Sequence, residues 1–371
     1  MKINSVNPTI EKGGAGEKEI AEYVATYLDD LGLETTLQEV EPGRFNAVGT
    51  LKGGGEGKTL LLEGHMDTVG IDYMTIDPLT PVVKEGRMYG RGTVDMKGGL
   101  AAMMSALRRI VDSGTELGGD LVFAGVCDEE YTQIGCRKAM ETIRADSAVI
   151  GEPTDLRIQV AHRGVVGVEV ETEGVTAHSA RWNIGVDAIT KMGKFLAAYE
   201  TINKTLLEKK HPLVGCASVH ASLIEGGNAI SSYPSRCKTT VLRWIVPPET
   251  LKDVEDEVSS IFQGISSDDD QFKASYNVIY YGPPAEVSRD ELICRLLGDS
   301  VKEEYGVEPK YFGASANYEQ GIISAHGVPT VCFGPSGGGA HSEEEWVDLD
   351  SVYKASRVYE SVIKNYCGVD H

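Results

Sequence analysis

Short apolar runs alternate with amphipathic segments over the first 160 residues of the chain. The runs at residues 58–69, 119–130 and 147–153 are typical of buried strands. Between the first two runs, residues 96–114 form a helical pattern that Gly114 can end. The apolar face of this pattern comprises Leu100, Met103, Met104, Leu107, Ile110 and Val111. The order of strand, helix and strand predicts an α/β sheet with parallel members.

The middle of the chain has a different pattern, in which strands and long helical segments follow one another as β-α-β-β-α-β. The expected elements are, in order, residues 164–173, 185–210, 216–226, 236–247, 248–265 and 273–281. This order predicts a small ferredoxin-like domain inserted into a larger one. The last ninety residues return to alternating helices and strands, which complete the larger domain. We therefore predict a larger domain formed by residues 1–165 and 282–371, and an inserted domain formed by residues 166–281.

The composition excludes several classes of partner. The net charge is −21, from 56 acidic and 35 basic residues, so no basic surface would offset the repulsion of nucleic acid or of an anionic membrane. No run approaches the roughly 20 apolar residues of a membrane span. The seven cysteines are odd in number and include no CxxC pair, which is typical of reduced cysteines in a cytoplasmic protein. We predict a cytoplasmic protein with neither nucleic acid nor a membrane as partner.

Ionisable residues follow the apolar runs of the larger domain. They are His65 and Asp67 after LLLEG, Asp95 in a glycine-rich turn, Asp128, Glu129 and Glu130 after LVFAGVC, and Glu152 after AVIG. The carboxyl ends of strands face the ligand crevice in open α/β sheets. Each residue alone is typical of a solvated loop, so the pattern leaves open a metal site and an acidic surface. A histidine among carboxylates, with no cysteine, suits zinc or a similar divalent metal better than calcium.

Six segments, in the order GHMDTV, GRGTVDMKGGLAA, DEE, GEPT, TAHSA and GPSGGGAHSEEEWV, resemble a known set of motifs. The set is that of the M20 group of dinuclear zinc peptidases and amidohydrolases, which includes acetylornithine deacetylase, succinyl-diaminopimelate desuccinylase, aminoacylase-1 and carboxypeptidase G2. The resemblance covers nearly the whole chain. It implies a zinc-peptidase-like catalytic domain with a mixed sheet and flanking helices. It also implies that the inserted ferredoxin-like α+β domain is a lid and dimerisation domain.

The resemblance implies the ligands of two divalent metal ions. His65 and Glu152 would bind one ion, Glu130 and His341 would bind the other, and Asp95 would bridge the two. Zinc is the expected metal, with cobalt or manganese as substitutes. Two such ions about 3.5–4 Å apart can activate a water molecule and polarise a scissile carbonyl.

The resemblance also implies catalytic roles. Asp67 would hold the second ring nitrogen of His65, and Glu129 would act as general base and then protonate the leaving amine. His178, in the inserted domain, would stabilise the tetrahedral oxyanion, either from the partner subunit of a dimer or from the same chain after domain closure. Glu345, four residues after His341, matches a family glutamate and is expected to support the ligands.

The candidate substrate-binding residues lie where the chain departs from the family. Ser231 stands where many members have asparagine, and Trp244 stands where they have an arginine that grips the substrate carboxylate. Arg243 comes one residue earlier, and neighbours on a strand face opposite sides. Asn228 and Arg243 are therefore retained only as candidates for substrate binding.

These features together predict the hydrolysis of the amide bond in N-acyl amino acids, because the segment GASANYEQ is closer to the acetylornithine deacetylase branch. A dipeptidase or exocarboxypeptidase with the same mechanism is the alternative. A metal-binding homologue without catalysis is the more remote alternative. The expected partners are a small N-acyl amino acid or dipeptide and a second copy of the chain, bound through the inserted domain.

Overall fold

The computed structural model describes residues 1–369, which form two compact units. The first unit comprises Met1–Val160, Val287–Phe312 and the chain from Tyr318 onward, and the second comprises Ala161–Glu286 and Gly313–Asn317. The expected boundaries, after residues 165 and 281, each lie five residues from those in the structure, after 160 and 286. The short segment Gly313–Asn317 was expected in the larger domain, and the structure assigns it to the smaller one.

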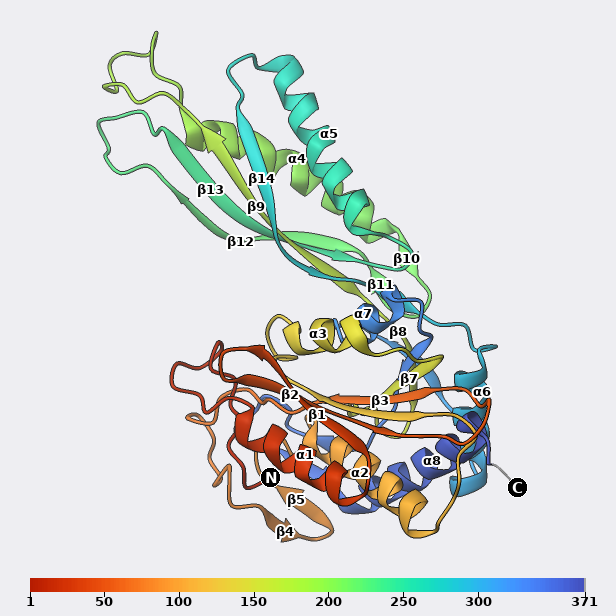
Figure 1. The fold of residues 1–371 in the computed structure, drawn as a ribbon. Helices are drawn as coiled ribbons and strands as arrows, with labels where there is room; N and C mark the ends of the chain where they lie inside the picture. Colours follow the sequence, from red (N-terminus) through yellow and green to blue (C-terminus); the bar gives the residue numbers. More distant parts are fainter. Residues whose placement is uncertain (370–371) are drawn as a thin grey trace. The chain divides into compact units, whose positions relative to one another are not determined.

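A mixed sheet forms the centre of the first unit (Figure 1). Its strands lie in the order β1 (Glu34–Glu41), β2 (Arg44–Leu51), β6 (Leu121–Val126), β3 (Leu60–His65), β7 (Ser147–Ile150), β17 (Thr330–Cys332) and β8 (Ile158–His162). The three apolar runs expected as strands are β3, β6 and β7, and β3 pairs in parallel with both of the others. The prediction of an α/β sheet with parallel members is thus confirmed. Strands β8, β15 (Ala285–Glu286) and β16 (Tyr311–Ala314) lie where the chain passes between the units.

Helices cover both faces of this sheet (Figure 1). On one face lie α1 (Lys18–Asp30), α2 (Lys97–Asp112) and α8 (Leu349–Cys367), with α6 (Leu292–Tyr305) beside α8, and on the other lie α3 (Ile134–Thr142) and α7 (Gln320–Ala325). Helix α2 buries its apolar face, including Leu100, Met103 and Leu107, as predicted. It ends just before Gly114, whose φ of +64° suits glycine.

The parallel pairing brings the ends of three strands to one edge of the sheet. His65, the last residue of β3, lies opposite Val126, the last residue of β6. Glu63 lies opposite Ile150, the last residue of β7. Residues that follow these strands therefore emerge close together, which is the geometry expected for the ionisable residues of the sequence motifs.

A small antiparallel sheet carries the last motif. Its strands lie in the order β18 (Gly337–Gly338), β19 (Trp346–Asp348), β5 (Arg87–Tyr89) and β4 (Val82–Lys84). Because β18 and β19 pair with each other, the loop between them, which contains His341, is held at both of its ends.

The second unit is an antiparallel sheet with two helices on one face (Figure 1). Its strands lie in the order β12 (Ser218–Gly226), β13 (Arg236–Ile245), β9 (Gly164–Glu173) and β14 (Ala274–Gly282), and its helices are α4 (Ala188–Glu208) and α5 (Leu251–Asp268). A two-stranded ribbon of β10 (Lys210–His211) and β11 (Gly215–Cys216) follows α4. Val168, Phe195, Val241 and Val258 are buried in its core. The chain order β9-α4-β12-β13-α5-β14 confirms the predicted ferredoxin-like arrangement.

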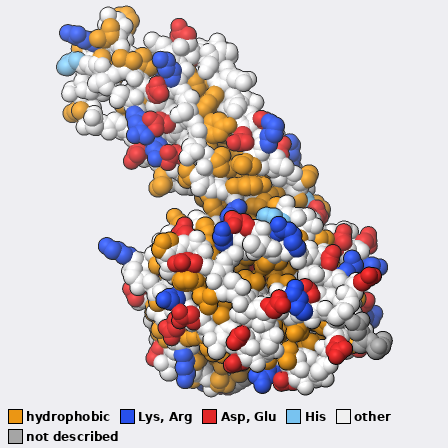
Figure 2. Space-filling view, viewed as in Figure 1, with side chains coloured by type: hydrophobic (Ala, Val, Ile, Leu, Met, Phe, Trp, Pro, Cys, Tyr) orange, Lys and Arg blue, Asp and Glu red, His pale blue; other side chains and the backbone are white. Residues whose placement is uncertain are grey.

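Within residues 1–369, no helix combines the length and apolar character required to cross a membrane. All seven cysteines have free thiols. Figure 2 shows acidic and basic side chains interspersed over the visible face, and hydrophobic side chains gathered over the strands of the second unit.

Candidate metal centre

His65 lies at the end of β3 and is fully buried. Its Nε2 atom lies 3.1 Å from Oδ1 of Asp95 and 3.8 Å from Oε1 of Glu152. Its Nδ1 atom lies 3.1 Å from the backbone oxygen of Asp67 and 3.5 Å from Oδ1 of the same residue. The imidazole therefore presents one nitrogen to two carboxylates and the other to Asp67, which can fix the orientation of the ring.

Asp95 lies between two histidines. Its Oδ1 atom faces Nε2 of His65 at 3.1 Å, and its Oδ2 atom faces Nε2 of His341 at 3.3 Å. The same nitrogen of His341 lies 2.9 Å from Oε2 of Glu130. Each oxygen of Asp95 is thus turned toward a different group of donors, as a carboxylate that bridges two metal ions would be.

Glu129 and Glu152 complete the cluster. Donor atoms of His65, Glu129 and Glu152 all lie within 4.8 Å of one another, and the same is true of His65, Asp95 and Glu130. Histidine nitrogens and carboxylate oxygens without sulfur are the donors that zinc, cobalt and manganese accept.

Burial and mutual repulsion disfavour charge on the glutamates of this cluster. Burial raises the pKa of Glu129 to about 8, with repulsion from Glu130 and Asp95 adding to the effect and His65 opposing it. Burial and repulsion from Asp95 raise the pKa of Glu152 well above its ordinary value. Positive charge brought to the cluster would reverse these shifts.

For the two histidines of the cluster, the neighbouring carboxylates favour the charged form and raise the pKa. Hydrogen bonds to Asp95 and Glu130 raise the pKa of His341 to about 10. Although burial opposes it, hydrogen bonds to Asp67 and Asp95 raise the pKa of His65 well above its ordinary value. The carboxylates thus draw protons onto both rings, and divalent cations can take the place of those protons because the ligands bind metal in their deprotonated form. The donor set fits divalent metal ions.

Asp67 connects the first histidine to the adjacent glutamates. Its carboxylate accepts hydrogen bonds from the backbone N–H groups of Glu129, at 3.1 Å, and Glu130, at 3.3 Å. It also accepts a hydrogen bond of 2.8 Å from Nδ2 of Asn7. One buried side chain therefore positions both the ring of His65 and the backbone of the two glutamates.

A further network supports this arrangement and was missed in the sequence. Asp128, whose φ is +67°, accepts hydrogen bonds from Asn7 at 3.0 Å and from Arg44 at 2.9 Å. Arg44 is in turn paired with the buried carboxylate of Glu17. Asp128 precedes the glutamate pair directly, and that position was the one available sign of its role. Asn7, Arg44 and Glu17 come from segments with no distinctive pattern.

Glu345 holds the loop that carries Asp95, the kind of support expected of it. Its Oε1 atom accepts hydrogen bonds from the backbone N–H groups of Val94, at 2.8 Å, and Asp95, at 3.1 Å. Its Oε2 atom accepts from Gly92 N–H at 2.9 Å and from Nη1 of Arg91 at 2.8 Å. Glu345, which is paired with Arg91, thus holds the backbone of Asp95 in place.

The other candidate residues belong to the second unit. His178 is exposed, its segment forms an isolated bridge with Ser232, and its Nδ1 atom accepts a hydrogen bond of 3.2 Å from Ala180 N–H. Asn228 is also exposed and lines a surface depression of about 250 Å³ together with Arg236 and Lys238. The structure thus brings together His65, Asp67, Asp95, Glu129, Glu130, Glu152 and His341 in the first unit, and it places His178, Asn228 and Arg243 in the second.

Arg243 has a different environment from the one that substrate binding requires. Its side chain is 2% exposed and lies on the face of β13 that the helices cover. Its guanidinium donates to Glu249 at 2.7 Å, to Glu257 at 3.3 Å and to the backbone oxygen of Trp244 at 2.6 Å. Its charge is therefore already neutralised within the unit. Trp244 faces the other side of the strand, where its ring stacks with the guanidinium of Arg163 at 4.7 Å.

Comparisons with known proteins show the family and the fold of the chain. The family model described as Peptidase family M20/M25/M40 matches residues 61–365. Acetylornithine deacetylase of Proteus mirabilis (strain HI4320) is 29% identical, with 98% of this chain and 94% of the deacetylase covered. The structure of aminopeptidase PepT from Bacillus cereus ATCC 10987 has a TM-score of 0.77 at 20% identity, covering 99% of this chain and 96% of the aminopeptidase. The structure of YXEP from Bacillus subtilis, a dinuclear metal binding peptidase from the M20 family, has a TM-score of 0.73 at 15% identity. The likeness covers 98% of this chain and 95% of YXEP. These likenesses confirm the expected fold.

Proposed function

The chain belongs to peptidase family M20/M25/M40 and is a hydrolase of amide or peptide bonds, and we propose that its reaction is the metal-dependent deacylation of N-acyl amino acids. The observation that carries the proposal is the position of Asp95, with one oxygen toward His65 and the other toward His341. A carboxylate placed in this way can bridge two divalent ions about 3.5–4 Å apart.

Five residues would hold the two ions. His65, Asp95 and Glu152 would hold one ion, and Asp95, Glu130 and His341 would hold the other. When bound, the ions supply Lewis-acid chemistry, polarising the amide carbonyl and making the attacking water more acidic. Zinc is the proposed metal, with cobalt or manganese as substitutes, since the donors are imidazole nitrogens and carboxylate oxygens.

Glu129 is the proposed general base. Its carboxylate lies close to His65 and Glu152 and is not one of the five proposed ligands, so it would remain available to accept a proton. It would accept a proton from water and pass it to the nitrogen of the leaving amine. Asp67 would keep the base in position, because it binds the backbone N–H of Glu129 at 3.1 Å.

His178 is the proposed stabiliser of the oxyanion that forms at the amide carbonyl. Its imidazole is exposed, so it is free to meet a substrate, whether from the same chain or from the partner subunit of a dimer. Asn228, also exposed, remains a candidate for contact with the substrate. We do not assign such a contact to Arg243, because Glu249 and Glu257 already bind its guanidinium.

A deacylase is favoured over a peptidase by the 29% identity with acetylornithine deacetylase over 98% of the chain. A dipeptidase or exocarboxypeptidase is the second candidate, since the likeness to an aminopeptidase structure extends over 99% of the chain. Both kinds of substrate are small and present an amide bond near a carboxylate.

A homodimer formed through the second unit is part of the proposal. Strand β12 lies at the edge of its sheet and exposes Leu223 by 70% and Ile224 by 58%, and such an edge can pair with a second copy. Sedimentation equilibrium that gives the mass of one chain would contradict the dimer. A cytoplasmic location is also proposed, supported by the seven free thiols.

A hydrolysis screen tests the choice of substrate. N-acetyl, N-succinyl and N-formyl amino acids and simple dipeptides would be incubated with the protein and added Zn²⁺, Co²⁺ or Mn²⁺. The proposal expects release of free amine from an N-acyl amino acid at a higher kcat/KM than from any dipeptide. The reverse order would establish the peptidase alternative.

A further inference from the structure

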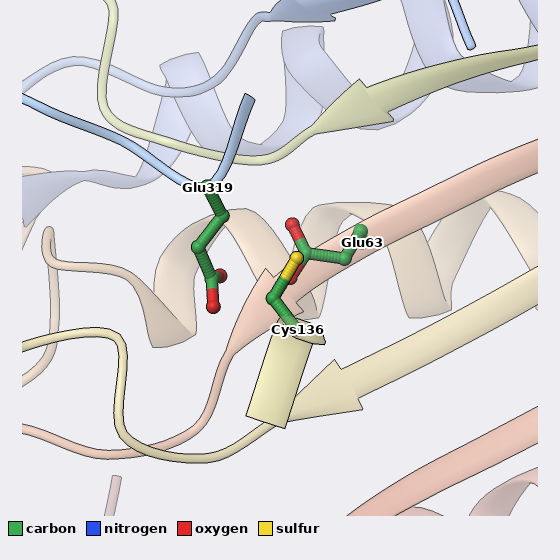
Figure 3. Close-up of side chains that lie close together, drawn as sticks. All are labelled: Glu63, Cys136 and Glu319. Atoms are coloured by element: carbon green, nitrogen blue, oxygen red, sulfur yellow. The ribbon is translucent and has the colours of Figure 1, made fainter. Parts of the chain in front are cut away.

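A second group of metal-binding residue types is buried in the first unit. Glu63 of β3, Cys136 of α3 and Glu319, the residue before α7, point toward one another (Figure 3). Each side chain is at most 1% exposed. One donor atom from each of the three lies within 4.8 Å of the others. Glu63 precedes His65 by two residues on β3, so the group and the candidate metal centre share this strand.

The two carboxyl groups have no partner other than each other. Within residues 1–369, no other group donates a hydrogen bond to an oxygen of Glu63 or of Glu319, and neither side chain forms an ion pair. The surroundings are apolar, since Cys136 packs in a cluster with Leu61 and Ile322. Buried carboxylates in such surroundings are costly unless a proton or a cation compensates them.

Protons alone compensate this group incompletely. The two carboxyl groups are close enough for one to hydrogen-bond the other, but only if one of them is protonated. That bond would satisfy one acceptor oxygen of four, and it would leave the sulfur of Cys136 without a role. A divalent cation can bind both carboxylates and the sulfur together.

We propose that Glu63, Cys136 and Glu319 bind a third divalent ion of the zinc class, separate from the pair of ions at Asp95. The donors are two carboxylates and a thiolate, and sulfur excludes calcium and magnesium as preferred ions. Ligands of a tetrahedral zinc ion lie about 3.5 Å apart, so donor atoms that lie within 4.8 Å of one another need to close by no more than about 1.3 Å. A carboxylate bound through both oxygens supplies the fourth donor.

This ion would have a structural role. It would join β3, α3 and the residue before α7, and its ligand Glu63 lies two residues before His65 on β3. Burial and the nearby Glu63 carboxylate raise the pKa of the Cys136 thiol well above its ordinary value, so the thiol stays protonated unless a cation binds it. Binding would therefore release a proton from Cys136.

Cobalt substitution distinguishes this site from the metal centre. A thiolate bound to Co²⁺ gives a charge-transfer absorption in the near ultraviolet, whereas the residues at Asp95 include no cysteine. The full-length protein would be expressed in cobalt-supplemented medium, and its spectrum and metal content would be measured. The proposal expects the thiolate band and three equivalents of cobalt per chain. Since neither readout requires turnover, the result is independent of the proposed deacylase activity.

Variants assign the band to its residue. Cys136→Ala is expected to lose the band and one equivalent of cobalt, and Glu319→Gln is expected to lose both as well. Cys294→Ala, which alters another fully buried cysteine outside the group, is the matched control and should keep both. Two equivalents and no band in the unaltered protein would overturn the proposal and identify the group as a proton-sharing carboxyl pair, even if the variants do not fold. A band that persists in Cys136→Ala would also overturn it.

Discussion

The candidate residues of the two units are held in very different ways. In the first unit, the carboxylate of Asp67 alone binds the backbone N–H groups of Glu129 and Glu130 and the side chain of Asn7. In the second unit, His178 and Asn228 are exposed, and their side chains are tied to few neighbours.

This difference explains why the sequence predicts the class of reaction more easily than it predicts the substrate. A buried centre works only if many polar groups are satisfied together, so its residue types and spacings are strongly constrained. An exposed side chain can change at little cost to stability, so the residues that contact the substrate can differ between relatives. The departures at Ser231 and Trp244 are in the second unit, as this view expects.

Loss of the proposed base should have the largest effect. Glu129→Gln is expected to lower kcat by roughly 10³-fold or more, because the amide cannot accept a proton, while the two ions stay bound. Steady-state kinetics and metal analysis would be done on the same preparation. Glu130→Gln is the contrast, since it should also lose one ion. A kcat of Glu129→Gln near that of the unaltered protein would remove Glu129 from the mechanism.

Loss of the exposed His178 of the second unit should lower kcat without lowering stability. His178→Ala is expected to lower kcat by about 10²-fold through the loss of oxyanion stabilisation. Its melting temperature and metal content should not change, because the imidazole is exposed. His220→Ala, at another exposed histidine of the same unit, should leave kcat as it is. Equal kcat values for the two variants would show that the second unit contributes no catalytic histidine at position 178.

Loss of the buried Arg243 of the second unit should lower the free energy of unfolding without changing substrate binding. Arg243→Met is expected to lower the free energy of unfolding by about 2–3 kcal/mol, because it leaves Glu249 and Glu257 without their partner. The KM for substrate should be unchanged in the protein that remains folded. Arg236→Met, at an arginine whose side chain is 60% exposed, is the control. A large rise in KM with normal stability would instead make Arg243 a substrate ligand.

The smallest effect concerns pH in the metal-free protein. Hydrogen bonds to Asp95 and Glu130 raise the pKa of His341 from 6.5 to about 10, and burial raises that of Glu129 from 4.5 to about 8. In both cases the folded state holds a proton that the unfolded state releases, so stability falls as pH rises through these ranges. Thermal unfolding in the presence of a chelator should thus show a melting temperature that declines between about pH 4.5 and pH 10, through the Glu129 range first and the His341 range last.

Saturating metal should suppress this decline, because bound ions replace the protons. His341→Asn should make the decline shallower in the metal-free protein. A melting temperature that is independent of pH after metal removal would show that the cluster does not couple protons to folding.

Much of the fold was predictable because its elements have regular patterns. The apolar runs that became β3, β6 and β7, and the order of elements in the second unit, follow directly from periodicity. His65, Glu130 and Glu152 lie at or just after the ends of β3, β6 and β7, so their position in sequence indicated their position in space.

The remainder depends on contacts between distant segments. Asn7 and Arg44 reach Asp128 across 121 and 84 residues of chain, and no local pattern marks such a contact. Alternation showed that Arg243 and Trp244 face opposite sides of β13, but only the packing of α5 determines which face is buried. The sequence pattern around Glu63 predicts only an apolar strand, because its neighbours Cys136 and Glu319 are far along the chain.

The central claim is that this chain hydrolyses amide bonds with divalent ions held around Asp95. The most direct test removes all metal with a chelator, returns Zn²⁺, Co²⁺ or Mn²⁺ in known amounts, and measures hydrolysis of N-acyl amino acids at each step. The expected result is no hydrolysis in the stripped protein and recovery as metal is returned, with no recovery in Glu129→Gln. Hydrolysis that survives complete removal of metal, or a fully loaded protein that cleaves neither N-acyl amino acids nor dipeptides, would contradict the claim.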